Sequence, residues 1–401
     1  MTTNKIIFVN RVFWPAEDAT AQLLYDLATG LAATGSTVEI VTASDGAESL
    51  SPASGAAIKI HRLDQNRMRT VGLLAKAMGY LRFALRAREA IKRIVRPGDR
   101  VVAMTDPPLL GPWLGQLARD RGAHMWHWSQ DLYPEVALAI APFGVFTKIL
   151  GNVKGWRDRE WRAATGVVAI GDDMATKIRA RQVSPDKIQI SGNWCPAGLN
   201  FADAVSQREA WNVSSDDFVV AYSGNLGRAH TLAPLVELAA RFSEESAVKF
   251  LVIGQGPQKS RLEQRAEELK AVNCRFLPPA PRSDLGRNLA AADLHVITMR
   301  ADCVGVVWPS KFYGIVAAGR PILFIGPADA EIAQIITREG LGIAVAENDF
   351  ATAEDFIVSL RGDPNRQTML RRRLNAFHRD LPGLAGAVAS WQRWLTSPVS
   401  S

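Results

Sequence analysis

The feature that most constrains the fold is an alternation of short apolar runs with longer amphipathic stretches along the chain. The short runs are rich in β-branched residues, which is typical of buried strands, whereas the longer stretches repeat leucines at helical spacing. Residues 19–34 show the helical spacing, and Gly35 ends that stretch. Strands and helices in this order build a parallel sheet with helices on both faces. The expected strands of the first half are 6–10, 38–42, 100–104, 124–129 and 166–170.

The same order begins again in the second half of the chain. Residues 185–216 are rich in turn-forming residues, and we place a domain boundary within them. A length of 401 residues is enough for two domains of similar size. We therefore predict an α/β protein with two Rossmann-like, doubly wound parallel-sheet domains that face a cleft. The first domain is predicted at 1–195 and the second at 196–384. A last helix within 385–401 is predicted to pack back onto the first domain. The expected strands of the second domain are 218–223, 250–253, 274–277, 294–297 and 321–325.

The composition excludes several classes of protein. With 47% hydrophobic and 22% charged residues, the chain is neither disordered nor a disulfide-rich mini-protein. Its three cysteines, Cys195, Cys274 and Cys303, are far apart and lack the spacing of metal ligands. An odd and small number of cysteines is expected in a reducing cytoplasm. We expect no secretory signal, and no segment has the ~18–20 consecutive apolar residues that cross a bilayer.

The formal net charge is +7, and basic residues gather in three segments. Such segments are either solvated helix faces or surfaces that attract lipid headgroups or phosphorylated substrates, and the sequence leaves both open. No RNA- or DNA-binding motif is present, so we expect no nucleic-acid partner. The basic segments are 82–100, 148–162 and 361–379.

Two expected strands of the second half run directly into glycine pairs. The first reads Tyr222-Ser223-Gly224-Asn225-Leu226-Gly227-Arg228, and the second reads Ile253-Gly254-Gln255-Gly256-Pro257. Glycine lets a backbone approach a phosphate closely, and an arginine holds a diphosphate through forked hydrogen bonds. Because carboxyl ends of parallel strands meet at one edge of the sheet, the pair favours a nucleotide site over ordinary turns.

Two helix starts are further candidates for anion binding. Ser310 and Lys311 follow Pro309, so a hydroxyl, a charge and backbone donors would converge, although Lys311 could equally be a surface charge. Asp18 is expected to cap the helix that follows it. The small residues Ala19 and Thr20 would leave backbone donors of that helix open to an anion. A plain capped helix is the alternative there. The absence of a GxGxxG pattern disfavours a nicotinamide cofactor.

In the first half, the strand at 124–129 leads into the polar segment Gln130-Asp131-Leu132-Tyr133-Pro134-Glu135. At that strand end, Asp131 could orient an acceptor hydroxyl or stabilise positive charge on a sugar carbon. The alternative is that Asp131 caps the next turn. His127 lies on the strand itself and is more typical of a hydrogen-bonded core histidine.

Taken in order, six motifs resemble a family-4 glycosyltransferase of the two-domain GT-B architecture. The similarity covers almost the whole chain and is greatest to the bacterial polysaccharide-assembly branch that includes N-acetylfucosaminyl transferase-like proteins. The motifs are Trp14-Pro15 with Ala19-Thr20-Ala21-Gln22-Leu23-Leu24, Gln130 to Glu135, Ser191-Gly192-Asn193-Trp194, Gly224-Asn225-Leu226-Gly227, Gly254-Gln255-Gly256-Pro257, and Pro309-Ser310-Lys311-Phe312-Tyr313-Gly314 through Ala317-Ala318-Gly319-Arg320-Pro321.

The resemblance implies transfer of a hexosyl or acetamidohexosyl group from a nucleotide-sugar, preferably a uridine diphosphate sugar, with retention at the anomeric carbon. The nucleotide-sugar is a substrate, and no metal or other cofactor is implied. The nucleotide would lie on the second domain and the acceptor on the first. The implied catalytic residues are Asp131, Arg228 and Lys311; the implied donor-binding residues are Thr20, Gly224, Asn225, Gly227, Gly254, Gly256 and Ser310; the acceptor-side candidates are Trp14, His127 and Glu135.

In this branch the acceptor is a glycan or a polyprenyl-diphosphate-linked sugar. The expected location is therefore the cytoplasm, at the inner face of the cytoplasmic membrane, with peripheral membrane contact. The aromatic and basic stretch Phe143–Trp161 is the candidate for touching lipid. A role of that stretch in the core and on the solvated surface remains open.

The chain departs from the family at two carboxylates. Many relatives carry two glutamates spaced eight apart before the Ala-Ala-Gly turn, one for the donor sugar and one for the ribose. Those positions here are Val306 and Gly314, and Asp302 is the nearest upstream acid. The departure motivates one alternative, a non-catalytic nucleotide-sugar-binding scaffold. A nucleotide-sugar epimerase on the same fold is a further alternative, but the missing carboxylates argue against it because proton abstraction needs a base.

Overall fold

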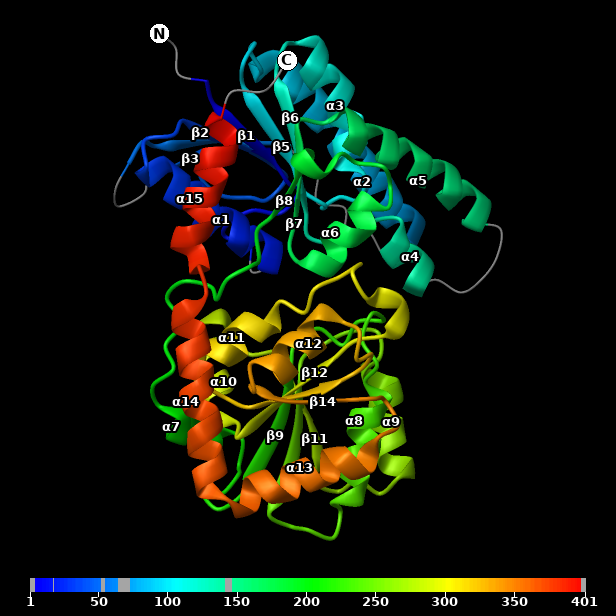
Figure 1. The fold of residues 1–401 in the computed structure, drawn as a ribbon, viewed down its shortest axis with the longest axis vertical. Coiled ribbons are helices and arrows are strands. Elements are labelled where there is room, and N and C mark those ends of the chain that lie inside the picture. The colour runs from blue at the N-terminus through cyan, green and yellow to red at the C-terminus, as the bar shows by residue number, and fades with distance from the viewer. Residues whose placement is uncertain (1–3, 17, 52–54, 64–72, 141–145, 398–401) are drawn as a thin grey trace. The chain divides into compact units, whose positions relative to one another are not determined.

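The computed structural model describes residues 4–16, 18–51, 55–63, 73–140 and 146–397. The chain divides into two compact units (Figure 1). The first contains Met1–Trp194, Gly305–Trp308 and Pro382–Ser401, and the second contains Cys195–Val304 and Pro309–Leu381. The sequence analysis placed these divisions after residues 195 and 384.

The described part of the first unit holds an eight-stranded sheet of order β3-β4-β2-β1-β5-β6-β7-β8. Every neighbouring pair is parallel except β3 with β4. The central strands are almost wholly buried, as expected of a sheet covered on both faces. The strands are β1 (Ile6–Val9), β2 (Val38–Thr42), β3 (Ser49–Leu50), β4 (Ile58–Arg62), β5 (Arg100–Ala103), β6 (His124–Ser129), β7 (Gly166–Ala169) and β8 (Ile188–Ile190).

One face of this sheet is covered by three helices that pack side by side, α2 against α3 and α3 against α5. Phe83, Ala87 and Ile91 of α2 are fully buried in the core cluster that lines this face. The helices of the unit are α1 (Ala19–Ala33), α2 (Leu73–Ile94), α3 (Leu110–Asp120), α4 (Glu135–Ile140), α5 (Phe146–Ala163), α6 (Asp172–Arg179), the 3-10 turn η1 (Pro185–Lys187) and α15 (Gly383–Thr396).

The helix α15 packs against α1 and completes the core of the first unit. Its Trp391 is fully buried, with ring centres 6.0 Å from Phe8 and 5.0 Å from Trp128. Trp128 in turn stacks on Trp194 at 6.2 Å, and the indole N–H of Trp194 donates to Asp26 at 3.1 Å. Residues from both ends of the chain therefore share one aromatic cluster.

The second unit holds a six-stranded parallel sheet of order β11-β10-β9-β12-β13-β14. The strand order reverses direction between β9 and β12, and ligands bind at the strand carboxyl ends beside such a switch point. The strands are β9 (Phe218–Ser223), β10 (Val248–Ile253), β11 (Cys274–Leu277), β12 (Leu294–Thr298), β13 (Ile322–Ile325) and β14 (Gly342–Val345).

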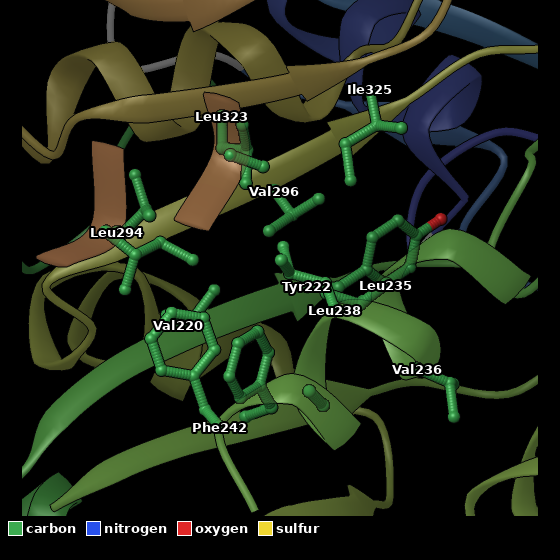
Figure 2. Close-up of a cluster of buried hydrophobic side chains, with 14 of the residues drawn as sticks. Val220, Tyr222, Leu235, Val236, Leu238, Phe242, Leu294, Val296, Leu323 and Ile325 are labelled. Atoms are coloured by element: carbon green, nitrogen blue, oxygen red, sulfur yellow. The ribbon is translucent and has the colours of Figure 1, made fainter. Parts of the chain in front are cut away.

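Helices cover both faces of this second sheet, and β9, β12 and α8 supply much of its core (Figure 2). In Figure 2, the Tyr222 ring lies among the apolar side chains while its hydroxyl oxygen points to the edge of the cluster. The helices are α7 (Ala204–Ala210), α8 (Ala233–Arg241), α9 (Lys259–Glu268), η2 (Arg282–Asp284), α10 (Leu285–Ala291), η3 (Ala301–Cys303), α11 (Lys311–Ala317), α12 (Glu331–Arg338), α13 (Phe350–Gly362) and α14 (Pro364–Asp380).

One local expectation is wrong. Asp18 occupies the residue before α1 with an extended backbone, but its side chain accepts no hydrogen bond from the first turn. Asp349 and Asp363 do cap α13 and α14, by accepting hydrogen bonds from backbone N–H groups. The Asp18 side chain is exposed instead, so α1 begins without the predicted cap.

Candidate functional site

In the second unit, the loops after β9 and β10 touch through their backbones. The Gly224 N–H donates to the Ile253 carbonyl at 2.9 Å. A Cβ atom on Gly254 would lie 1.9 Å from the Gly224 oxygen, and one on Gly256 would lie 2.5 Å from the Leu226 oxygen. These glycines have φ angles of +147°, +152° and +154°, which side chains rarely adopt. Only glycine fits at these three positions.

The side chain of Lys311 reaches the underside of this glycine loop. A Cβ atom on Gly224 would lie 3.0 Å from the Lys311 Nζ atom, which itself lies 3.4 Å from the centre of the Tyr222 ring. Within the described residues this nitrogen is buried and has no hydrogen-bond partner. Burial lowers the pKa of Lys311 well below its usual range. A buried ammonium without a counter-charge is costly, so the position favours an anion as the missing partner.

Two groups beside Lys311 escaped the sequence analysis. The His230 Nδ1 atom lies 2.9 Å from the Thr298 carbonyl at the end of β12. Burial, and then the charge of Lys311, lower the pKa of His230 to about 4, so its ring is neutral at pH 7. The Thr298 hydroxyl is buried without a partner among the described residues. His230 follows Arg228 by two positions, and this closeness to a candidate residue is the signal in the sequence that could have found it.

Arg228 lines an open groove of about 1160 Å³ at the same edge of the second unit. Arg300 also lines it and pairs with Asp302 through bonds of 3.0 and 2.6 Å. The hydrogen bonds from Arg300 hold the pKa of Asp302 below its usual range. Asp302 is therefore already engaged in an ion pair. The other titratable side chains that line the groove are His230, Glu237, Arg261, Arg265, Glu268 and Glu347.

Neither family glutamate position presents a polar side chain here. Val306 is buried, and Gly314 lies on the buried face of α11, where a Cβ atom would lie 3.0 Å from a methyl carbon of Leu289. Glu347 is a carboxylate in the groove that the sequence analysis did not consider. It accepts a hydrogen bond of 2.8 Å from the Thr231 hydroxyl.

The remaining donor-binding candidates do not all lie in one place. Asn225 and Gly227 follow Gly224 in the same loop, where a Cβ on Gly227 would lie 3.0 Å from the Asn225 amide nitrogen. Ser310 immediately precedes α11, is exposed, and makes no capping hydrogen bond. Thr20 lies on α1 of the first unit, so it does not join the other candidates within one unit.

In the first unit, Asp131 borders a cavity of about 30 Å³ at the carboxyl ends of β5 and β6, enough for one water molecule. Burial, and then the negative charge of Asp106, raise the pKa of Asp131 to about 6. Burial, and then the charges of Asp131, Tyr80 and Asp106, raise the pKa of Tyr133. Polar groups in the cavity wall are Thr105, His127, Ser129, Asp131, Tyr133 and Arg157.

A second group that sequence reasoning missed lies beside Asp131. The guanidinium of Arg11, just after β1, donates two hydrogen bonds of 2.9 and 2.8 Å to Asp106, just after β5. Burial raises the pKa of Asp106 although Arg11 opposes the shift. Tyr80 of α2 lies 5.5 Å from Arg11, measured from the ring centre to the guanidinium carbon. These side chains form an acceptor-side cluster with Asp131.

Glu135 is held in an ion-pair network rather than directed into open space. It accepts a hydrogen bond of 2.9 Å from Arg157 Nη2 and a shorter one from Nη1, and Lys154 lies 3.5 Å away. Burial opposes ionisation, but Arg157 outweighs it and holds the pKa of Glu135 below its usual range. Arg157 itself is buried and lies 3.9 Å over the Trp161 ring.

The other two acceptor-side candidates lie apart from Glu135. His127 is buried on β6, with Nε2 3.5 Å from Glu160 Oε1, and Arg119 donates two bonds of 2.7 and 2.8 Å to that carboxylate. Trp14 is 38% exposed, and its ring centre lies 5.8 Å from that of Tyr25. His127 borders the Asp131 cavity, whereas Trp14 does not.

Among the residues that the structure describes, no group of three or more His, Cys, Asp or Glu side chains is placed to hold a metal ion. None of the described helices is both long and apolar enough to cross a bilayer. In the stretch Phe143–Trp161, residues 143–145 lie outside the described residues. Trp161 is buried beneath Arg157, and Trp156 packs against Trp113 of α3 with ring centres 5.4 Å apart, so these tryptophans contact the protein.

Comparison with protein families gives two matches in succession along the chain. A family model described as Glycosyl transferase 4-like domain matches residues 19–194, and one described as Glycosyl transferases group 1 matches residues 204–372. The first match lies in the first unit and the second largely in the second unit.

Two curated relatives are distant. WcaI of Escherichia coli K12, named as a colanic acid biosynthesis glycosyl transferase, is 24% identical over 62% of this chain and 62% of its own length. WbjE of Pseudomonas aeruginosa, named as a glycosyltransferase, is 26% identical over 73% of this chain and 72% of its own length. The chain thus matches less than two thirds of WcaI.

Solved structures share the fold over nearly the whole chain. Sucrose-phosphate synthase from Thermosynechococcus elongatus gives a TM-score of 0.78 at 15% identity, over 97% of this chain and 98% of that one. WaaG, a glycosyltransferase of lipopolysaccharide biosynthesis, gives 0.72 at 16%, over 98% and 100%. Anabaena HepE in complex with UDP-glucose gives 0.74 at 14%, over 98% and 100%. The predicted pair of Rossmann-like parallel-sheet domains, the GT-B fold, is confirmed.

Proposed function

We propose that this chain, which belongs to the group 1 and GT4-like glycosyltransferases, transfers a sugar from a nucleotide-sugar to an acceptor hydroxyl during synthesis of a bacterial surface polysaccharide. The observation that carries the proposal is the buried Lys311 Nζ atom beneath Gly224, which has no hydrogen-bond partner among the described residues. The names of WcaI and WaaG support polysaccharide synthesis as the setting.

On the donor side, Lys311 and Arg228 neutralise the diphosphate of the nucleotide-sugar. Negative charge grows on that diphosphate as the bond to the sugar breaks, so cations fixed at this point lower the barrier. The glycines at 224, 254 and 256 allow the phosphate oxygens to approach the backbone without a Cβ atom in the way. Uridine diphosphate is the proposed carrier, which the HepE complex with UDP-glucose supports.

On the acceptor side, Asp131 orients the attacking hydroxyl of a glycan or of a polyprenyl-diphosphate-linked sugar. With a pKa of about 6, Asp131 is ionised at pH 7 and accepts the hydroxyl's hydrogen bond. No side chain is required to form a covalent bond to the sugar. The leaving phosphate takes the acceptor's proton, and attack from the same face retains the anomeric configuration.

Nucleotide binding is the first test of the proposal. A ligand at 100 times its Kd stabilises the folded chain by about 2.7 kcal/mol, which a thermal shift resolves. We expect a shift with UDP and with a UDP-sugar, a much smaller one in Lys311→Met and Arg228→Gln, and an unchanged one in Arg372→Gln, which removes an exposed charge from α14. No shift with any uridine or guanosine nucleotide contradicts the proposal.

The residues at 306 and 314 support one competing proposal, a scaffold that binds a nucleotide-sugar without turning it over. The two functions differ in whether bound donor is consumed. A transferase releases UDP when both donor and lipid-linked acceptor are present, whereas a scaffold gives the same thermal shift and no UDP under any acceptor condition.

A further inference from the structure

The loop between β9 and α8 is held by one glutamine of a neighbouring loop. Gln258 immediately precedes α9, and its Nε2 atom donates hydrogen bonds to the Gly227 carbonyl at 2.5 Å and to the His230 carbonyl at 3.0 Å. Its backbone N–H donates a third bond, to the Leu226 carbonyl at 3.3 Å. Three carbonyl groups of one loop are therefore bound by a single residue of another loop.

The two side-chain bonds of Gln258 close the turn that carries Arg228. The His230 N–H donates to the Gly227 carbonyl at 3.1 Å, so residues 227–230 form a turn with Arg228 as its second residue. Gln258 bridges the first and last residues of this turn. A primary amide has two N–H donors, and only its nitrogen side can meet two carbonyl acceptors at once. The backbone is thus fixed on both sides of Arg228.

The turn has a weaker contact from the strand on the other side of β9. The sheet order places β10, which precedes Gln258, and β12, which precedes Arg300, on opposite sides of β9. Arg300 donates from its backbone N–H to the Ala229 carbonyl at 3.4 Å and from Nη1 to the Arg228 carbonyl at 3.5 Å. Both bonds are longer than those from the Gln258 side chain, so Gln258 is the main support of the turn.

A fixed turn matters because of where Arg228 is. Its side chain is exposed and lines the open groove that Gln258 also lines. A long exposed side chain samples many rotamers, and ordering it on a ligand costs conformational entropy. A turn that also moved would add the freedom of the backbone to that cost. With the turn fixed, only the side-chain torsions of Arg228 remain to be ordered when an anion binds.

We infer that Gln258 is a positioning residue for donor binding, which fixes the turn of Arg228 so that the guanidinium meets the diphosphate of the nucleotide-sugar. The inference rests on the proposed function, in which Arg228 binds that diphosphate. The Gln258 Nε2 atom is occupied by two carbonyl groups of the turn. Gln258 therefore acts through the backbone that carries Arg228.

Calorimetric titration with UDP in a double-mutant cycle tests the inference. Gln258→Leu keeps the approximate shape of the side chain and removes both donors. It should weaken UDP binding by roughly tenfold in the parent, but by less than about twofold when Arg228→Gln is already present. A residue that only stabilises the fold would act equally in both backgrounds. Gln258→Asn, which is one methylene shorter, is a second variant for the same cycle.

A matched control lies on α14, outside the groove. Gln367 is half-buried like Gln258, and its Nε2 atom donates to the Leu360 carbonyl at 2.8 Å. Gln367→Leu should lower the melting temperature and leave the affinity for UDP unchanged. Hydrogen exchange without ligand is a second measurement: residues 226–230 should exchange faster in Gln258→Leu than in the parent, and at the parent's rate in Gln367→Leu.

Three results overturn the inference and leave the proposed function intact. They are equal UDP affinity of the parent and Gln258→Leu, an equal loss of affinity with and without Arg228→Gln, and unchanged hydrogen exchange of residues 226–230 in Gln258→Leu. A parent chain that binds no UDP contradicts the proposed function, and with it the role of Gln258 toward a diphosphate.

Discussion

The Nζ atom of Lys311 lies 3.4 Å from the centre of the Tyr222 ring, although the two residues are on different elements of the second unit. The face of an aromatic ring attracts a cation, and the attraction reaches about 2 kcal/mol where water is excluded. The ring thus offsets part of the cost of burying the ammonium until a stronger partner arrives. Lys311 is held in place before the anion binds.

Lys311→Met should separate binding from folding. A charged hydrogen bond contributes about 1.5–3 kcal/mol, so the variant should bind UDP about ten- to hundredfold more weakly. Without ligand it should melt at a higher temperature than the parent, because the buried unpaired charge is gone. Titration by calorimetry and thermal melting measure the two effects. A lower melting temperature together with unchanged UDP affinity contradicts the placement of Lys311.

The difference in stability between Lys311→Met and the parent should change with pH in one direction. Since burial lowers the pKa of Lys311, the unfolded chain holds more protons than the folded chain between the lowered value and 10.5. The free energy of unfolding of the parent therefore rises with pH in that window. The advantage of Lys311→Met should shrink as the pH approaches 10.5, which melting curves at several pH values would show.

Asp131 should set the acid limb of the activity profile. Because its pKa is raised to about 6, kcat/KM should fall as the pH drops through about 6 and the carboxylate takes a proton. Asp131→Asn should lower kcat and remove this limb. Asp106→Asn should move the limb to lower pH, because a neighbouring negative charge is lost. An unchanged limb in both variants would assign it to another group.

The same shift affects stability in the opposite direction to the usual carboxylate. The folded chain holds the Asp131 proton between 3.8 and about 6, so the free energy of unfolding falls as the pH rises through that window. Asp131→Asn should be at least as stable as the parent at pH 7. Denaturant unfolding at pH 5 and pH 7 tests this directly.

Gly254→Ala should damage the donor site through the backbone. A Cβ atom there would lie 1.9 Å from the Gly224 oxygen at a φ of +152°, so the two loops must separate. We expect a loss of about 1–3 kcal/mol in stability and a raised KM for the donor. Gly155→Ala on α5 has open space around its Cβ and should instead gain about 0.5–1 kcal/mol.

Glu135→Gln should act on stability and not on the acceptor. The change leaves the buried Arg157 with Asp158, 2.6 Å away, as its remaining carboxylate partner. Breaking such a pair costs about 3 kcal/mol. Urea unfolding should show that loss, while the KM for the acceptor stays near the parent value. A raised acceptor KM without loss of stability would restore Glu135 as an acceptor-side residue.

The sequence was most informative where the conformation of the local backbone requires one residue type. The glycines at 224, 254 and 256 have φ angles that disfavour other residues, and they follow strands with a clear apolar pattern. Their position at the sheet edge was therefore predictable. The strands β3, β4, β8 and β14 were missed. β3 and β8 have only two and three residues, β14 begins with glycine, and the apolar residues of β4 alternate with Lys59 and His61 instead of forming a continuous run.

Side-chain partners were much less predictable. Arg11 and Asp106 are 95 positions apart and meet only because β1 and β5 are neighbours in the sheet. Glu135 looked available for an acceptor until α5 brought Arg157 to it. The sequence shows that position 135 carries a carboxylate and that it lies near the end of a strand. Which cation pairs with that carboxylate depends on tertiary packing.

The burial of Trp391 between Phe8 and Trp128 has a consequence for how the chain folds as it is made. A ribosome must finish the whole second unit before α15 emerges, so the first unit stays without a piece of its core until then. The second unit, made of Cys195–Val304 and Pro309–Leu381, can form earlier. The half of the molecule that is synthesised first is therefore the last to become fully packed.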